Sequence, residues 1–114
     1  MNKKRNRTMD TYLKAGALMR LYKTIGAKVY ATVGSVVSAA DRAKLLWAAR
    51  GIDAVCSNAE ENMFRDHPHL PEQYVDVFYG TTEQEPRNDV DKAVLAMARE
   101  IADEVTKHVR TEDA

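Results

Sequence analysis

The stretch "SAADRAKLLWAARG", residues 38–51, marks the point at which one long helix ends and a second begins. Ser38 is a natural N-cap, and Asp41 places a carboxylate in the first turn, where the helix dipole favours it. Apolar residues then recur every three or four positions, the spacing of one helical face: Leu45, Ala49, Ile52, Cys56, Ala59 and Met63. Because Pro68 disfavours helical backbone at His67, we predict that the helix ends at or before that residue.

The preceding segment, residues 9–37, predicts a first long helix. Its apolar residues also recur in steps of three or four: Leu18, Tyr22, Ile25, Val29, Val33 and Val36. We expect this stripe to face the core of the protein. Gly26 lies on the same face and has no side chain, so a neighbouring helix could approach closely there.

The stretch "RDHPHLPEQYVDVFYG", residues 65–80, predicts a corner followed by a short helix over 71–79. Pro71 suits a first helical position and Gly80 suits a helix end. The alternative is a metal or proton-transfer site that uses acidic and histidine side chains: Glu60, Glu61, Asp66, His67 and His69. Two histidines separated by one proline point to opposite faces of an extended segment. We therefore favour the corner and expect no metal ion and no cofactor.

A last helix follows the polar loop at residues 81–89. Asn88 or Asp89 can cap it, and Asp91 lies in its first turn. Its apolar residues again share one face: Val90, Val94, Met97, Ala98, Ile101, Val105 and Val109.

These segments predict an all-α fold, a bundle of three long amphipathic helices plus one short crossing helix. We expect a disordered basic arm at residues 1–8, one helical domain at 9–110 and a frayed tail at 111–114. No apolar run reaches the ~18 residues of a membrane helix, so we expect no membrane contact. The single Cys56 fits a reducing compartment, and we expect a cytoplasmic location.

Charge is distributed unevenly although its net value is zero. Residues 1–40 carry eight Lys/Arg and one acid, whereas residues 41–114 carry nine Lys/Arg and sixteen Asp/Glu. A basic arm and helix can track phosphates without reading sequence, so the candidate nucleic-acid contacts are Lys3, Lys4, Arg5, Arg7, Lys14, Arg20, Lys23 and Lys28. The interpretation that we favour is that the basic and acidic helices lie against each other.

A set of large apolar residues forms the second candidate surface. Aromatic side chains are enriched at the energetic centres of protein interfaces, and the candidates are Leu46, Trp47, Tyr74, Phe78 and Tyr79. The alternative, which we favour, is that these side chains seal the bundle against the crossing helix.

The sequence contains no convincing catalytic arrangement. Cys56 lies on an apolar stripe, where a cysteine behaves as a small hydrophobe, and no glycine-rich phosphate loop occurs. Our leading hypothesis is a small non-enzymatic binding protein, a regulator or adaptor acting through protein–protein contacts as a homodimer. The alternative is a nucleic-acid-binding accessory protein, and a metal-dependent or other small enzyme comes third.

Overall fold

The computed structural model describes the backbone of residues 7–113 and the side chains of residues 7–107. The described chain is all-helical and has no strand, as predicted. It contains three α-helices and two short 3₁₀ segments, which are α1 (Met9–Val33), η1 (Gly34–Val36), α2 (Ala39–Asp66), η2 (Glu72–Asp76) and α3 (Asp89–Asp113).

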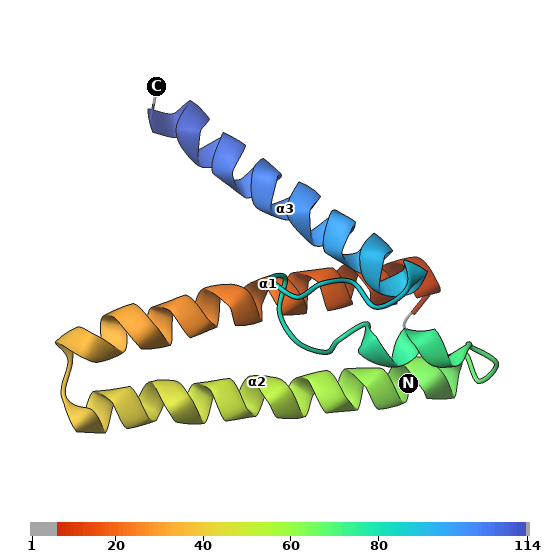
Figure 1. The fold of residues 1–114 in the computed structure, drawn as a ribbon, viewed down its shortest axis with the longest axis horizontal. Coiled ribbons are helices and arrows are strands. Elements are labelled where there is room, and N and C mark those ends of the chain that lie inside the picture. The colour runs from red at the N-terminus through yellow and green to blue at the C-terminus, as the bar shows by residue number, and fades with distance from the viewer. Residues whose placement is uncertain (1–6, 114) are drawn as a thin grey trace, which may run out of the picture.

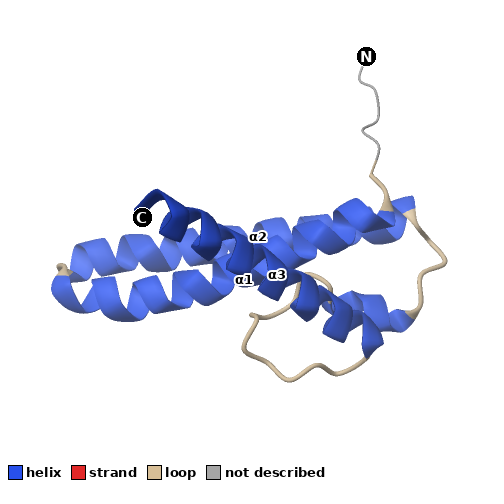
Figure 2. Cartoon of the chain, turned by 90° about the horizontal axis from the view of Figure 1, so that it is seen from above, coloured by secondary structure: helices blue, strands red, loops and turns tan. Residues whose placement is uncertain are grey.

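The helices α1 and α2 form a long antiparallel hairpin, and α3 crosses it at one end (Figure 1). The first half of α3 packs against α1 and η2. The second half points away from the hairpin in Figure 1, and in the view from above it passes over the hairpin (Figure 2). The predicted bundle is therefore formed at one end of the molecule, where α3 and η2 meet the hairpin.

Side-chain caps fix where the helices begin. The Ser38 hydroxyl accepts a hydrogen bond from the Asp41 amide at 3.1 Å, which confirms the predicted start of α2. The Thr8 hydroxyl accepts from the Thr11 amide at 3.2 Å in the same way. At α3, the side-chain oxygen of Asn88 accepts from the Asp91 amide at 2.8 Å. Each cap satisfies one backbone donor that has no partner within its helix.

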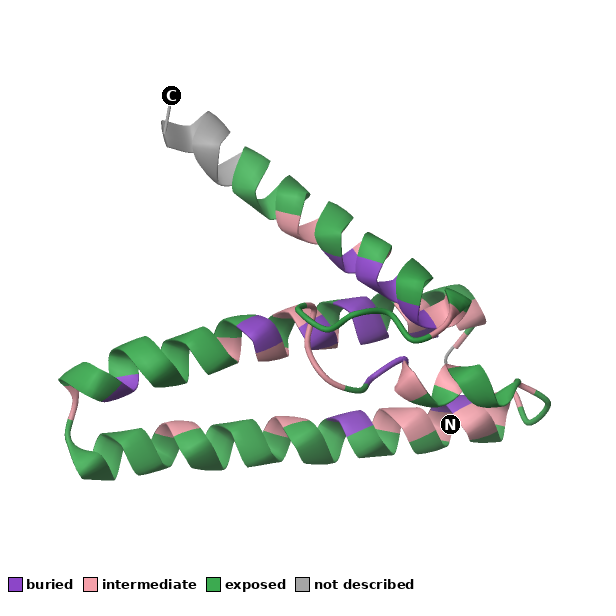
Figure 3. Cartoon of the chain, in the orientation of Figure 1, coloured by how far each residue is buried: buried purple, intermediate pink, exposed green. Residues whose placement is uncertain are grey.

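The core lies where η2 and α3 meet the covered end of the hairpin (Figure 3). Its buried apolar side chains come from all three helices and from the segment after η2: Tyr12, Ala17, Cys56, Met63, Val77, Phe78, Val94, Leu95 and Ala98. Gly16 lets Val77 approach the backbone of α1, since a Cβ atom there would lie 2.5 Å from the Val77 carbonyl oxygen.

Several predicted bounds differ from the structure. The first helix ends at Val33 and is followed by a 3₁₀ turn, where a helix to residue 37 was expected. Residues 72–76 form a 3₁₀ segment in place of the predicted short α-helix over 71–79. The helix α3 continues through Asp113, into the predicted frayed tail. Most of the predicted basic arm, residues 1–6, lies outside the described residues.

Candidate functional site

The apolar stripe of α1 faces away from the core, which corrects the orientation predicted from the sequence. The buried side chains of α1 form a different row: Tyr12, Gly16, Ala17, Arg20 and Thr24. At 100° per residue, the stripe lies about 180° from this row. Its members are accordingly exposed, with Tyr22 at 59% and Ile25 at 53% of full exposure.

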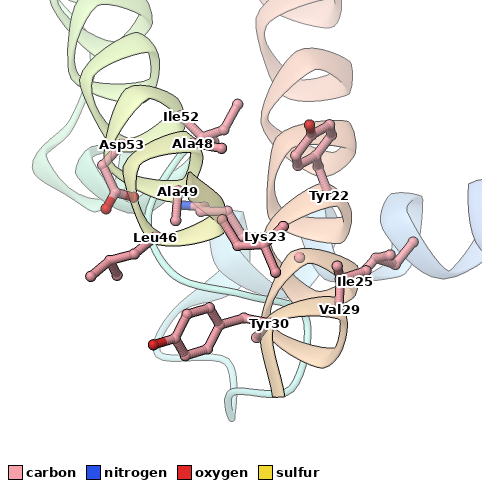
Figure 4. A pocket seen from close by; sticks show the side chains of 13 residues that line it. Tyr22, Lys23, Ile25, Val29, Tyr30, Leu46, Ala48, Ala49, Ile52 and Asp53 are labelled. Carbon is pink, nitrogen blue, oxygen red and sulfur yellow. The ribbon is translucent and has the colours of Figure 1, made fainter. Parts of the chain in front are cut away.

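Next to this stripe, α1 and α2 enclose an open groove of about 620 Å³ (Figure 4). Its lining is mainly apolar and comes from the middle of both helices: Tyr22, Ile25, Gly26, Ala27, Val29, Tyr30, Leu45, Leu46, Ala48, Ala49 and Ile52. Between residues 25 and 55, all of which the structure describes, Gly34 is the single buried residue. No element in the described part of the chain therefore covers this half of the hairpin.

Two charged residues, Lys23 and Asp53, complete the lining of the groove. The Lys23 ammonium donates a hydrogen bond of 2.8 Å to the Phe78 carbonyl oxygen, so it also holds the chain that leaves η2. Burial is the main cause that raises the pKa of the nearby Cys56 thiol, and Asp53 adds to it against the opposing charge of Lys23. A thiol with a raised pKa is a poor nucleophile. The groove thus offers a mainly apolar contact surface.

The five predicted protein-contact residues do not form one surface. Leu46 lines the groove. Trp47, on α2, and Tyr79 are exposed at 68% and 56%, and each lies beside an arginine, Arg50 or Arg87. Tyr74 is partly buried against the core. Phe78 is a core residue, exposed at 3%, so within the chain it packs in the core and is not part of an exposed contact surface.

The predicted nucleic-acid residues are also dispersed. Lys14 is exposed on α1. Lys28 forms an exposed ion pair with Glu83 at 3.2 Å. Arg7 forms an ion pair with Asp66 at 2.9 Å. Lys3, Lys4 and Arg5 lie outside the described residues, and no row of free cations follows α1 in the described part.

Arg20 was predicted as a surface cation and is instead the most buried charged residue described, exposed at 1%. Its guanidinium pairs with the carboxylate of Asp91 and donates to the backbone carbonyl oxygens of Asp76 at 3.1 Å and Thr81 at 3.2 Å. The side chain is enclosed by these contacts, so Arg20 is unsuited to bind a phosphate. The spacing of Arg20 with Tyr12, Gly16 and Thr24 was the available signal, because these residues share a helical face.

The corner at residues 65–80 is held by contacts within the chain. The Tyr12 hydroxyl donates to Asp66 at 2.6 Å, and Arg7 pairs with the same carboxylate. The imidazole of His67 bonds to the Arg7 carbonyl oxygen at 3.0 Å and packs edge-on against the Tyr12 ring. These contacts join the end of α2 to the start of α1. Among the described residues, no group of three or more His, Cys, Asp or Glu side chains is placed to hold a metal ion.

No protein-family model, curated protein or solved structure matches this chain. None of the described helices is both long and apolar enough to cross a bilayer. The candidate site therefore consists of the groove together with the exposed α1 stripe, and we call this surface the hairpin face: Leu18, Tyr22, Ile25, Val29, Val33, Leu45, Leu46, Ala49 and Ile52.

Proposed function

We propose that the protein is a small non-enzymatic binding protein, a regulator or adaptor, that self-associates and contacts protein partners through the hairpin face. The observation that supports this proposal is the exposed apolar stripe of α1 beside an apolar groove. Large contiguous apolar patches on soluble proteins mark interaction sites. A groove between two helices is moreover the form of site that receives the apolar face of a third helix.

Self-association would also complete the core. The packed end of the molecule contains α3 and η2, whereas none of the described elements covers the other half of the hairpin. Burying a valine or isoleucine side chain stabilises by roughly 1.5–3 kcal/mol, and the stripe of α1 offers several such side chains. If a second copy covers this stripe, the free energy gained by burying these side chains would offset the loss of translational freedom on association.

The test is the mass of the protein in solution before and after the hairpin face is made polar. We expect light scattering at about 100 μM to give a mass near twice 12.8 kDa. The double change Ile25→Glu and Val29→Glu should give the monomer mass, because carboxylates would then have to be buried at the interface. Circular dichroism should show unchanged helix content, since both residues are exposed in the monomer.

The matched control is Ala54→Glu, an exposed position on α2. Ala54 is two residues from both Ile52 and Cys56 and therefore projects from the opposite side of the helix. This variant should remain a dimer. A wild-type protein that is monomeric at about 100 μM, or a dimer that tolerates the two glutamates on α1, would overturn the proposal.

A further inference from the structure

The helix α3 carries a second apolar row that extends beyond the body of the protein. The row begins at Val94, which is fully buried, and continues through the partly buried Ile101 to Val105, exposed at 58%. Figure 3 shows the change from buried to exposed along this helix. A row with helical spacing that passes from the core into solvent lacks a partner over its second half.

The projecting part of α3 and the groove have similar lengths. The α1 side of the groove runs from Tyr22 to Tyr30. At about 1.5 Å per residue, this is a groove of about 13 Å. The described part of α3 from residue 99 to 107 has the same number of residues and therefore the same length. One helix of this size would cover the groove along its full extent.

The charges beside these two surfaces are of opposite sign. Arg42 and Arg50 lie one helical turn on either side of Leu46, a residue that lines the groove, so the three form one row along α2. On α3, the exposed Glu100 and Glu104 lie four residues apart beside Ile101, within the span of the two arginines, which are eight residues apart.

The two segments also differ in net charge. Residues 21–50 contain five Lys/Arg and one acid, whereas residues 99–107 contain three acids, Glu100, Asp103 and Glu104, and two cations, Arg99 and Lys107. Charge complementarity of this kind fixes register and excludes wrong partners.

We propose that the groove of each molecule is occupied by the projecting half of α3, residues 99–107, from a second copy of the chain. This inference rests on the proposed function and names the occupant of its hairpin face. The two contacts are equivalent because each copy donates one α3 and receives the other, as two-fold symmetry requires. Val105 then packs against the apolar lining while Glu100 and Glu104 meet Arg42 and Arg50.

The pairing of the α3 glutamates with the α2 arginines is tested by two charge-reversal variants, one for each surface. The two variants are measured separately and then as a mixture. One variant carries Glu100→Lys and Glu104→Lys, and the other carries Arg42→Glu and Arg50→Glu. Each places like charges together in its own dimer, so we expect sedimentation analysis to show dimerisation weakened by about tenfold or more. An equimolar mixture restores opposite charges at both contacts, and we expect a heterodimer of near wild-type affinity.

The control is Lys92→Glu, an exposed reversal at the packed end of α3, which should leave dimerisation unchanged. Circular dichroism on each variant separates lost association from lost folding. Dimers of both reversed variants with wild-type affinity, or a mixture that recovers none of the lost affinity, would exclude α3 as the occupant. If the wild-type dimer is nevertheless broken by Ile25→Glu and Val29→Glu, the hairpin face remains the dimer interface. Only the proposal that α3 occupies it is then rejected. A monomeric wild-type protein rejects both proposals.

Discussion

The guanidinium of Arg20 connects three parts of the chain that are far apart in sequence. It pairs with Asp91 on α3 and donates to the carbonyl oxygens of Asp76 and Thr81 in the segment that leads from η2 to α3. A guanidinium has five N–H donors in a fixed plane, which lets one side chain satisfy several acceptors. Arg20 therefore determines where α3 begins relative to α1.

Replacing Arg20 with Ala should be among the most destabilising single changes in the chain. It removes the cation that pairs with the buried Asp91 carboxylate and the side-chain donor to the carbonyl oxygens of Asp76 and Thr81. Breaking a buried ion pair costs about 3–5 kcal/mol. Urea denaturation followed by circular dichroism measures the loss. The control Arg99→Ala removes an exposed arginine from α3 and should change the free energy of unfolding by at most about 0.5 kcal/mol. Equal stability of the two variants would show that the buried pair is unimportant.

Asp91 should make stability depend on pH in acid. Burial acts to raise the pKa of its carboxyl group, but hydrogen bonds from Arg20 and from the Arg87 amide, with the charges of both arginines, hold this pKa below its usual value. A carboxylate with a lowered pKa stabilises the fold above its unfolded pKa of about 3.9. That contribution is lost as pH falls through the lower, folded pKa.

The measurement compares the wild type with Asp91→Asn at about pH 6 and pH 3. We expect the wild type to be the more stable protein at the higher pH. At about pH 3, the difference in the free energy of unfolding between the two proteins should be smaller. The wild type loses the contribution of the Asp91 carboxylate, whereas the asparagine has no proton to gain. A difference that is the same at both pH values would show that Asp91 does not titrate between them.

The role of Arg20 was not predictable from its residue type alone. Lysine and arginine on a helix lie in solvent in most cases, so Arg20 was grouped with Lys23 and Lys28. Its partner Asp91 was read only as a favourable charge in the first turn of α3. The spacing of Arg20 with Tyr12, Gly16 and Thr24 indicates a buried face, but the ion pair joins residues 71 positions apart, so local spacing does not identify Asp91 as the partner.

At the scale of elements, Gly16 decides how closely the segment after η2 approaches α1. The change Gly16→Ala would place a methyl group 2.5 Å from the Val77 carbonyl oxygen. Relieving that overlap should cost about 1–3 kcal/mol, as other insertions into packed cores do. The matched control is Gly51→Ala on α2, where a Cβ atom would meet nothing within 4 Å. It should stabilise by up to ~1 kcal/mol through helix propensity. Thermal melts should show a lower melting temperature for Gly16→Ala and a higher one for Gly51→Ala.

Helix starts and types were predictable because their causes are local. Ser38 caps α2, and Pro68 limits its end at Asp66. The orientation of α1 was not predictable in the same way. Periodicity identifies an apolar face, and we assumed that this face is turned inward. The structure instead buries the side with Gly16, Ala17 and Arg20, since the two small residues admit α3 and the segment after η2. Which face meets which neighbour depends on contacts distant in sequence.

At the scale of the whole molecule, packing is concentrated at one end. The described residues span 47 × 37 × 37 Å, because the hairpin and α3 diverge from a shared core. The structure places the residues of the three predicted sites in different ways. The histidine corner became a junction between α1 and α2, and the basic residues were scattered. Of the predicted contact residues, Leu46 lies on the hairpin face, which is a property of the assembled hairpin and of neither helix alone.

The uneven distribution of the core also has a consequence for how the chain opens. Local unfolding begins where few buried contacts oppose it, and in this protein that place is the end of the hairpin around η1. The end held by Arg20 and Asp91 opens last. Separation of α1 from α2 therefore proceeds from the turn towards the core. A partner bound in the groove would hold the two helices together at the turn end, so tighter binding would also slow their local unfolding.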